Sequence, residues 1–175
     1  MAGPIEIDVW QGEIAELEVD ALVISANESL FMTAGAAASV KRHGGAEIES
    51  DAIDQGPTES GTAIVTRAGS LAATYVIHAV GVGHERLPDR DRLAAAIRTA
   101  VGFSEPLQLR RIAFSLIGVE HGTFSATEAA VVLVDELIGA TAGHELPEAI
   151  TIATANAAET RAASGALAAH RAHVT

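Results

Sequence analysis

Short apolar segments with the character of β-strands alternate with helical segments along the chain. In residues 5–9 the apolar side chains alternate with acidic ones, as they do in a half-exposed strand. Five further segments are more continuously apolar, as in strands buried on both faces: residues 21–24, 63–65, 75–77, 112–114 and 150–152. This alternation with short connections predicts an α/β sandwich that holds a mostly parallel sheet.

Helix boundaries follow from capping residues, glycines and apolar stripes. Ser125 with Glu128 has the pattern of a capping box, and Asn156 with Glu159 has the same pattern ahead of a last helix. Gly44 and the glycine after it are expected to end an earlier helix. The helices predicted in this way include residues 34–43, 93–101 and 130–138.

The composition limits the kinds of function. The chain has 175 residues with 11 basic and 23 acidic side chains, which gives a formal net charge of −12. At this charge we expect neither direct nucleic-acid binding nor attachment to an anionic membrane. The absence of cysteine excludes disulfides, thiolate metal sites and a cysteine nucleophile. With no apolar run of membrane-helix length and no leader-like start, a single cytoplasmic domain over residues 1–175 is expected.

Two loops that join a strand to a helix are candidates for binding an anion. Residues 27–38 and 115–124 each follow a predicted strand, and ligands of open α/β sheets lie beyond the carboxyl ends of the strands. The first loop also fits an alanine-rich turn packed against the sheet, and the second carries Glu120 in its middle. His78 lies among apolar neighbours and is predicted to be a hydrogen-bonded core residue. The histidines show no metal-ligand spacing, so no metal site is predicted.

The order of these segments resembles the macro domain family. Residues 9–14 and 19–27 read VWQGEI and VDALVISAN, close to the family's G-D-I and V-D-A-I-V-N-A-A-N. Residues 75–81 read YVIHAVG, close to the family's Y-V-I-H-x-V-G, and residues 111–114 and 122–124 continue the match. The resemblance implies a three-layer α/β/α sandwich with a mixed sheet. It also implies a ligand, ADP-ribose or a related nucleotide, free or carried on an ADP-ribosylated protein, and no cofactor.

In this family an acidic residue accepts from the adenine amino group, and backbone amides of two glycine-rich loops hold the diphosphate and the distal ribose. The resemblance gives Glu13 the first role and brings Asn27 next to the distal ribose. The full set of ligand-binding residues that it implies is Glu13, Ile14, Asn27, Thr33, Gly35, Ala36, Ala37, Gly118, Val119, Glu120, His121, Gly122, Thr123, Phe124 and Asn156.

Several of these positions depart from the family pattern. Ala37 stands where many hydrolytic members have a water-assisting aspartate, and Thr33 and Ala36 add side chains where glycines are usual. Glu120 places a carboxylate where a phosphate-facing glycine is expected, which predicts repulsion of a diphosphate. Asn156 fits a helix cap better than a ribose contact.

Three functions therefore remain open. The first is a non-catalytic module that binds ADP-ribose or a related nucleotide, weakened by the loop substitutions. The second is a hydrolase of ADP-ribosyl or acyl-ADP-ribose derivatives that works without the aspartate, through Asn27, His121 or the phosphate of the substrate; no catalytic residue is assigned. The third is a degenerate macro fold that serves protein–protein interaction.

Overall fold

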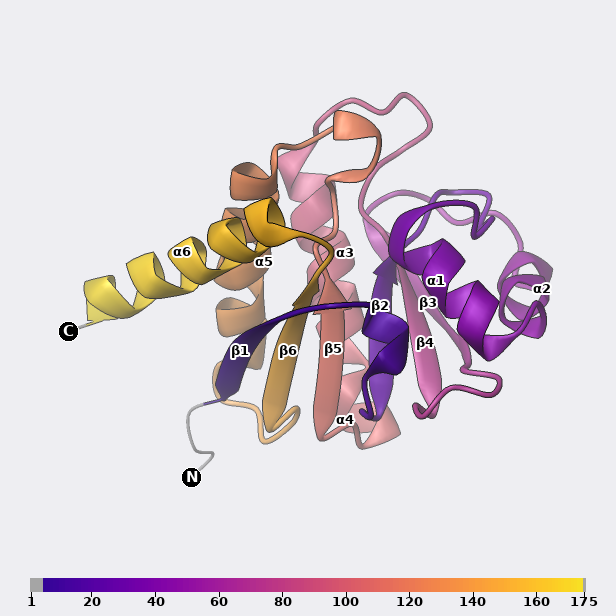
Figure 1. Cartoon of the computed structure of the whole chain (residues 1–175), viewed down its shortest axis with the longest axis horizontal. Helices are drawn as coiled ribbons and strands as arrows, with labels where there is room; N and C mark the ends of the chain where they lie inside the picture. The colour runs from indigo at the N-terminus through magenta and orange to yellow at the C-terminus, as the bar shows by residue number, and fades with distance from the viewer. Residues whose placement is uncertain (1–4, 175) are drawn as a thin grey trace.

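A six-stranded sheet with the strand order β1-β6-β5-β2-β4-β3 forms the centre of the molecule (Figure 1). The computed structural model describes residues 5–174. The strands are β1 (Glu6–Gln11), β2 (Ala21–Ser25), β3 (Thr62–Arg67), β4 (Tyr75–Val80), β5 (Arg111–Ser115) and β6 (Ala149–Thr154). The helices are α1 (Gly35–Gly44), α2 (Glu47–Asp54), α3 (Arg90–Gly102), α4 (Ser104–Leu107), α5 (Ala126–Thr141) and α6 (Ala157–Val174), with 3₁₀ turns η1 (Ile14–Glu16) and η2 (Glu120–Gly122).

The sheet is mixed and mostly parallel, as predicted. Along the order β1-β6-β5-β2-β4, each strand runs parallel to its neighbour. Among the six strands only β3 pairs antiparallel, and its partner is β4. The expectation that residues 63–65 are buried on both faces is wrong. They lie in β3, an edge strand in which Ala63 is buried but Ile64 and Val65 are only partly buried, because no strand covers its outer side.

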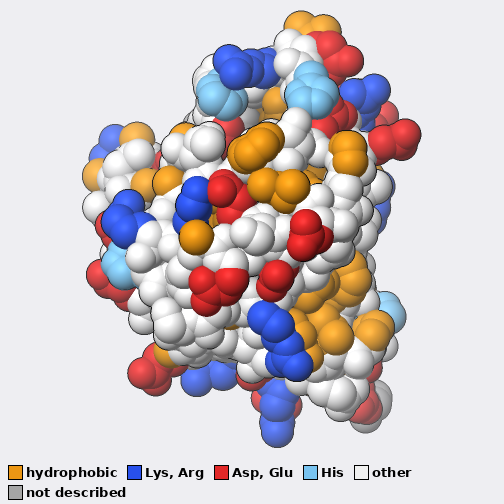
Figure 2. Space-filling view, turned by 90° about the vertical axis from the view of Figure 1, so that its right-hand side faces the viewer, with side chains coloured by type: hydrophobic (Ala, Val, Ile, Leu, Met, Phe, Trp, Pro, Cys, Tyr) orange, Lys and Arg blue, Asp and Glu red, His pale blue; other side chains and the backbone are white. Residues whose placement is uncertain are grey.

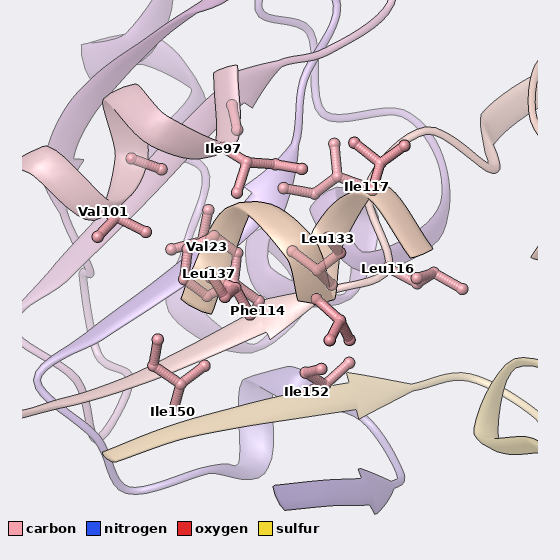
Figure 3. Close-up of a cluster of buried hydrophobic side chains, with 14 of the residues drawn as sticks. Val23, Ile97, Val101, Phe114, Leu116, Ile117, Leu133, Leu137, Ile150 and Ile152 are labelled. Atoms are coloured by element: carbon pink, nitrogen blue, oxygen red, sulfur yellow. The ribbon is translucent and has the colours of Figure 1, made fainter. Parts of the chain in front are cut away.

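Alternate residues of the central strands face two separate layers of helices. Val23 and Phe114 pack with α3 and α5 on one face of the sheet, and Figure 3 shows Phe114 beside Val23 and Leu137. Leu22 and Ala113, each one residue earlier in its strand, pack with η1 and α1 on the other face. This period of two residues produces the three layers.

Of the two predicted capping boxes, the structure forms the one at Ser125 completely and the one at Asn156 only in part. The Ser125 hydroxyl accepts from the Glu128 amide while the Glu128 carboxylate accepts from the Ser125 amide, which completes the capping box of α5. Asn156 caps α6 through its side-chain oxygen, but Glu159 accepts from the amide of Ala155 rather than from that of Asn156. None of the helices within residues 5–174 is long and apolar enough to cross a membrane.

His78 lies in β4 and is fully buried, as predicted for a core residue. Its Nε2 atom is 2.9 Å from the Thr66 hydroxyl, but its Nδ1 atom has no hydrogen-bond partner in the described chain, so the ring is only half satisfied. Burial lowers the pKa of His78 from 6.5 to about 4, because the charged ring would lose its hydration.

The buried ring makes stability depend on pH. Because the folded-state pKa of His78 lies below 6.5, the unfolded chain binds the proton first, so stability is complete above that pH and falls as the pH drops towards about 4. Between pH values of about 7 and 4 we expect the wild type to lose about 3 kcal/mol more than His78→Gln, measured by urea denaturation. The two proteins share the same carboxylates, so the difference between their free energies of unfolding removes the contribution of those carboxylates to the pH dependence. Parallel pH profiles would contradict the assignment.

Candidate ligand-binding site

The carboxyl ends of β2 and β5 lie side by side, and the chain leaves them in opposite directions. After β2 it runs through α1 and α2 towards the β3 edge, whereas after β5 it runs through η2 and α5 to β6, nearer the other edge (Figure 1). Such a divergence opens a crevice above the strand ends, where open α/β sheets bind ligands. The crevice is bordered by three loops: residues 26–34, 81–89 and 116–125.

Two neighbouring cavities occupy this crevice. The Glu13 cavity has a volume of about 630 Å³ and is lined by Gly12, Glu13, Ile14, Ala34, Gly35, Ala36, Ser39, Arg42, Ser115, Leu116, Val119, Glu120, His121, Ala153, Ala155 and Glu159. The Asn27 cavity has a volume of about 410 Å³ and is lined by Ser25, Ala26, Asn27, Ser29, Phe31, Thr33, Ala34, Ala37, Val82, Gly83, His84, Arg86, Glu120 and His121. Both volumes are in the range of small-molecule sites, roughly 300–1,000 Å³.

Glu13 presents a charged carboxylate at the Glu13 cavity. Its oxygens accept from the Ser39 hydroxyl at 2.9 Å and from the Arg42 guanidinium at 3.1 and 3.2 Å. These partners lower the pKa of Glu13, the Ser39 hydrogen bond most and the Arg42 charge less. Because both partners are on α1, the carboxylate is held in one orientation and stays ionised to accept from a ligand.

The amino end of α1 also faces the crevice. Ala34 is its N-cap residue and offers no side-chain cap, while Gly35 adopts a positive φ of 57° that favours glycine. Residues 34–36 line the Glu13 cavity, so the first amides of α1 lie at its wall. A helix amino end carries a partial positive charge that attracts anions.

A buried hydroxyl without a partner lies at the same cavity. Ser115 is the last residue of β5, is only 7% exposed, and lines the Glu13 cavity. Its Oγ atom makes no hydrogen bond with any residue of the described chain. The Oγ atom itself is almost completely buried, so a ligand group can pair with it only where the cavity wall shifts slightly; such pairing is favoured because an unpaired buried hydroxyl costs about 1–3 kcal/mol.

The loop that leads into α1 is fixed by a carboxylate on α2. The Glu49 side chain accepts from the Met32 amide and from the Lys41 ammonium group, both at 2.6 Å. These two hydrogen bonds lower the pKa of Glu49, that of Lys41 most. Glu49, which lies on α2, therefore joins the loop at Met32 to α1 at Lys41.

The Asn27 cavity carries several nitrogen-bearing side chains in this acidic protein. His84, Arg86 and His121 line it, and Figure 2 shows histidine and basic side chains gathered at the top of the molecule, where Figure 1 places the β4–α3 loop. Glu28 fixes this loop by accepting from the His84 amide at 3.0 Å. The side-chain nitrogen Nδ2 of Asn27 donates to the Phe31 carbonyl oxygen at 2.9 Å, within the turn that follows β2.

Glu120 lies where the two cavities meet, since it lines both. Its carboxylate turns back into its own loop and accepts from the Gly118 amide at 2.9 Å. Burial raises the pKa of Glu120, and this effect outweighs the hydrogen bonds from the Ser25 hydroxyl and from the loop amides. The carboxylate thus lies inside the crevice.

Most of the residues implied by the family resemblance line these cavities. They are Glu13, Ile14, Asn27, Thr33, Gly35, Ala36, Ala37, Val119, Glu120 and His121. The structure does not bring the remaining five, Gly118, Gly122, Thr123, Phe124 and Asn156, to the lining of either cavity.

The physical reasons differ among these five. Phe124 packs into the core with α3 and α5, and Gly118 is buried beside it and contributes an amide to Glu120. Gly122 and Thr123 close the loop through their own backbone amides, which donate to Val119 and Glu120. Asn156 is the cap of α6.

Sequence analysis missed several lining residues. Ser115 fell within the second candidate loop but was not selected, although its position at a strand end was a usable signal. His84 and Arg86 come from the loop after β4, which reaches the crevice because β4 is the neighbour of β2. Within residues 5–174, no three histidine or acidic residues come together as a metal site.

Residues 23–133 match the model of the macro domain. The chain belongs to the macro domain family. A protein of Mycobacterium tuberculosis is 32% identical over 130 residues, which are 74% of this chain and 36% of that protein. The chain thus spans about a third of the length of the mycobacterial relatives it matches. A protein of Aquifex aeolicus is 31% identical over 134 residues, 76% of this chain and 81% of that protein.

Solved macrodomain structures share the whole fold. The Oceanobacillus iheyensis macrodomain with ADP superposes with a TM-score of 0.86 at 19% identity, over 94% of this chain and 91% of that chain. The Trypanosoma brucei macrodomain in complex with ADP-ribose has a TM-score of 0.86 at 20% identity, over 93% of this chain and 69% of that chain. Because these identities are only 19% and 20%, the similarity establishes the fold alone.

Removing the Glu49 carboxylate is expected to loosen the first loop. Glu49→Ala deletes the acceptor of the Met32 amide, so we expect faster hydrogen exchange at that amide and a stability loss of about 2 kcal/mol. Hydrogen exchange followed by mass spectrometry and urea denaturation measure the two effects. Asp51→Ala, an exposed carboxylate on the same helix, is the matched control and should change neither. Unchanged exchange in Glu49→Ala would show that the loop is held elsewhere.

Proposed function

We propose that this macro domain binds an adenosine-containing nucleotide of the ADP-ribose type. Its adenosine part occupies the Glu13 cavity, where Glu13 accepts from the adenine amino group, and its distal ribose extends into the Asn27 cavity. A protein that carries such a nucleotide as a modification is a further partner that fits this role. The chain spans about a third of the length of its mycobacterial relatives, so this proposal concerns the domain alone.

The Glu13 carboxylate, held by Ser39 and Arg42 at the wall of the Glu13 cavity, is the observation that carries the proposal. A cavity that has a fixed carboxylate on its wall and an unpaired hydroxyl buried just behind that wall suits a ligand with both hydrogen-bond donors and acceptors, such as a nucleoside. The macrodomains of similar fold that are bound to ADP and to ADP-ribose support this ligand class.

The strong negative charge of the protein does not oppose this function. The amides at the amino end of α1 attract a polar ligand locally, and they do so without net positive charge. Binding is proposed rather than hydrolysis because Ala37, which lines the Asn27 cavity, has no group that could orient a water molecule.

Ligand-dependent thermal stability tests the proposal. A ligand at ten times its Kd adds about 1.4 kcal/mol to the stability of the folded state, which corresponds to a rise in Tm of roughly 3–5 °C for a domain of this size. We expect such a rise in scanning fluorimetry with millimolar adenosine or ADP-ribose, and none with matched uridine. The absence of a shift with both adenine ligands would refute the proposal.

The Ser115→Ala variant separates a ligand contact from a structural role. Removing an orphan hydroxyl should leave the Tm of the free protein unchanged or slightly higher, since no hydrogen bond is lost. Adenosine affinity in calorimetry should fall about fivefold, the equivalent of about 1 kcal/mol. Ser164→Ala, which removes an exposed hydroxyl on α6, is the control. A lower Tm together with unchanged affinity would assign Ser115 to the fold alone.

A further inference from the structure

We propose that Glu120 lowers the affinity of the crevice for ligands whose adenosine carries a diphosphate, so that adenosine itself binds more tightly than ADP or ADP-ribose, because the Glu120 carboxylate already occupies the amide site between the two cavities. This inference rests on the proposed function and deepens it by ranking the adenosine-containing ligands that the site can take. It concerns the part of the site that joins the Glu13 cavity to the Asn27 cavity.

The position of Glu120 gives it control over what can span the crevice. It lines both cavities, so the part of a ligand that connects adenosine to a second ribose must pass its side chain. In ADP-ribose this connecting part is the diphosphate, which carries two negative charges. A neutral 5′ end, as in adenosine, leaves the Glu120 carboxylate undisturbed.

The loop around Glu120 is held together by its own hydrogen bonds. Gly118 O accepts from Phe124 N at 3.0 Å and Val119 O accepts from Gly122 N at 3.1 Å. The Glu120 carboxylate adds a further bond by accepting from Gly118 N at 2.9 Å. The carboxylate is therefore a resident anion in a loop of backbone amides, and a diphosphate would have to displace it to use the Gly118 amide.

Charge in the surroundings also disfavours a diphosphate at this place. The raised pKa of Glu120 reflects its burial within the crevice and the nearby Glu159 carboxylate, which lines the Glu13 cavity as well. Arg42, the guanidinium at that cavity, is bound to Glu13. A diphosphate beside Glu120 in the Glu13 cavity would lie near two carboxylates, while Arg86 lines only the Asn27 cavity, and like charges repel in a partly buried site.

The features that hold adenosine are separate from Glu120. Glu13 is oriented by α1, and the Ser115 hydroxyl lies at the end of β5. Neither residue forms a hydrogen bond to Glu120 in the described structure. Changing the charge of Glu120 is thus expected to alter the preference among 5′ substituents while leaving nucleoside binding in place.

Calorimetry with three probes tests this inference: adenosine, ADP and ADP-ribose. We expect the wild type to bind adenosine about tenfold more tightly than ADP or ADP-ribose. In Glu120→Gln, which keeps the shape and removes the charge, ADP and ADP-ribose should gain about tenfold in affinity while adenosine stays within about twofold. Glu145→Gln removes an exposed carboxylate in the loop before β6 and should change none of the three.

Each outcome bears on one of the two proposals. Tighter binding of ADP-ribose than of adenosine by the wild type would overturn the selectivity and leave the proposed function standing. Equal gains for all three probes in Glu120→Gln would also overturn it. No binding of any probe by the wild type or the variant would refute the proposed function itself. Glu120→Ala is the second variant if Glu120→Gln does not fold, and the wild-type comparison is decisive without either.

Discussion

The divergence of the chain above β2 and β5 is the constraint on which the rest of the site depends. These two parallel strands are neighbours, yet their connections run towards opposite edges of the sheet, which leaves space above their carboxyl ends. The two cavities lie in the space left there, and the loops that border them are anchored in well-packed strands. The amino end of α1 and Ser115 line the crevice for this reason.

Net charge and local electrostatics act on different scales in this protein. A charge of −12 argues against the capture of extended polyanions, because that depends on the field of the whole molecule. Within the crevice the charged and polar groups that face a ligand include a few oriented amides and the carboxylates of Glu13, Glu120 and Glu159. Glu120 satisfies an amide of its loop from inside the chain, so the local preference is set by a single side chain.

The sequence allowed much of the fold to be predicted, and part of the site. Period-two strands and the Ser125 cap are local patterns, and the Asn156 cap of α6 is another. Glu13 and Asn27 were found through the family resemblance, and both line a cavity. The exposed edge of β3 and the contribution of His84 were missed, because each depends on which strands become neighbours. The inward direction of Glu120 depends on side-chain torsions that no pattern encodes.

The Glu49 anchor has a practical consequence. Its partner Lys41 is the only lysine in the sequence, so a reagent directed at lysine side chains has a single side-chain target in this protein. That target is joined through Glu49 to the Met32 amide of the loop that borders the crevice. A fluorescent label at Lys41 would place a spectroscopic reporter at the base of this loop without engineering the chain.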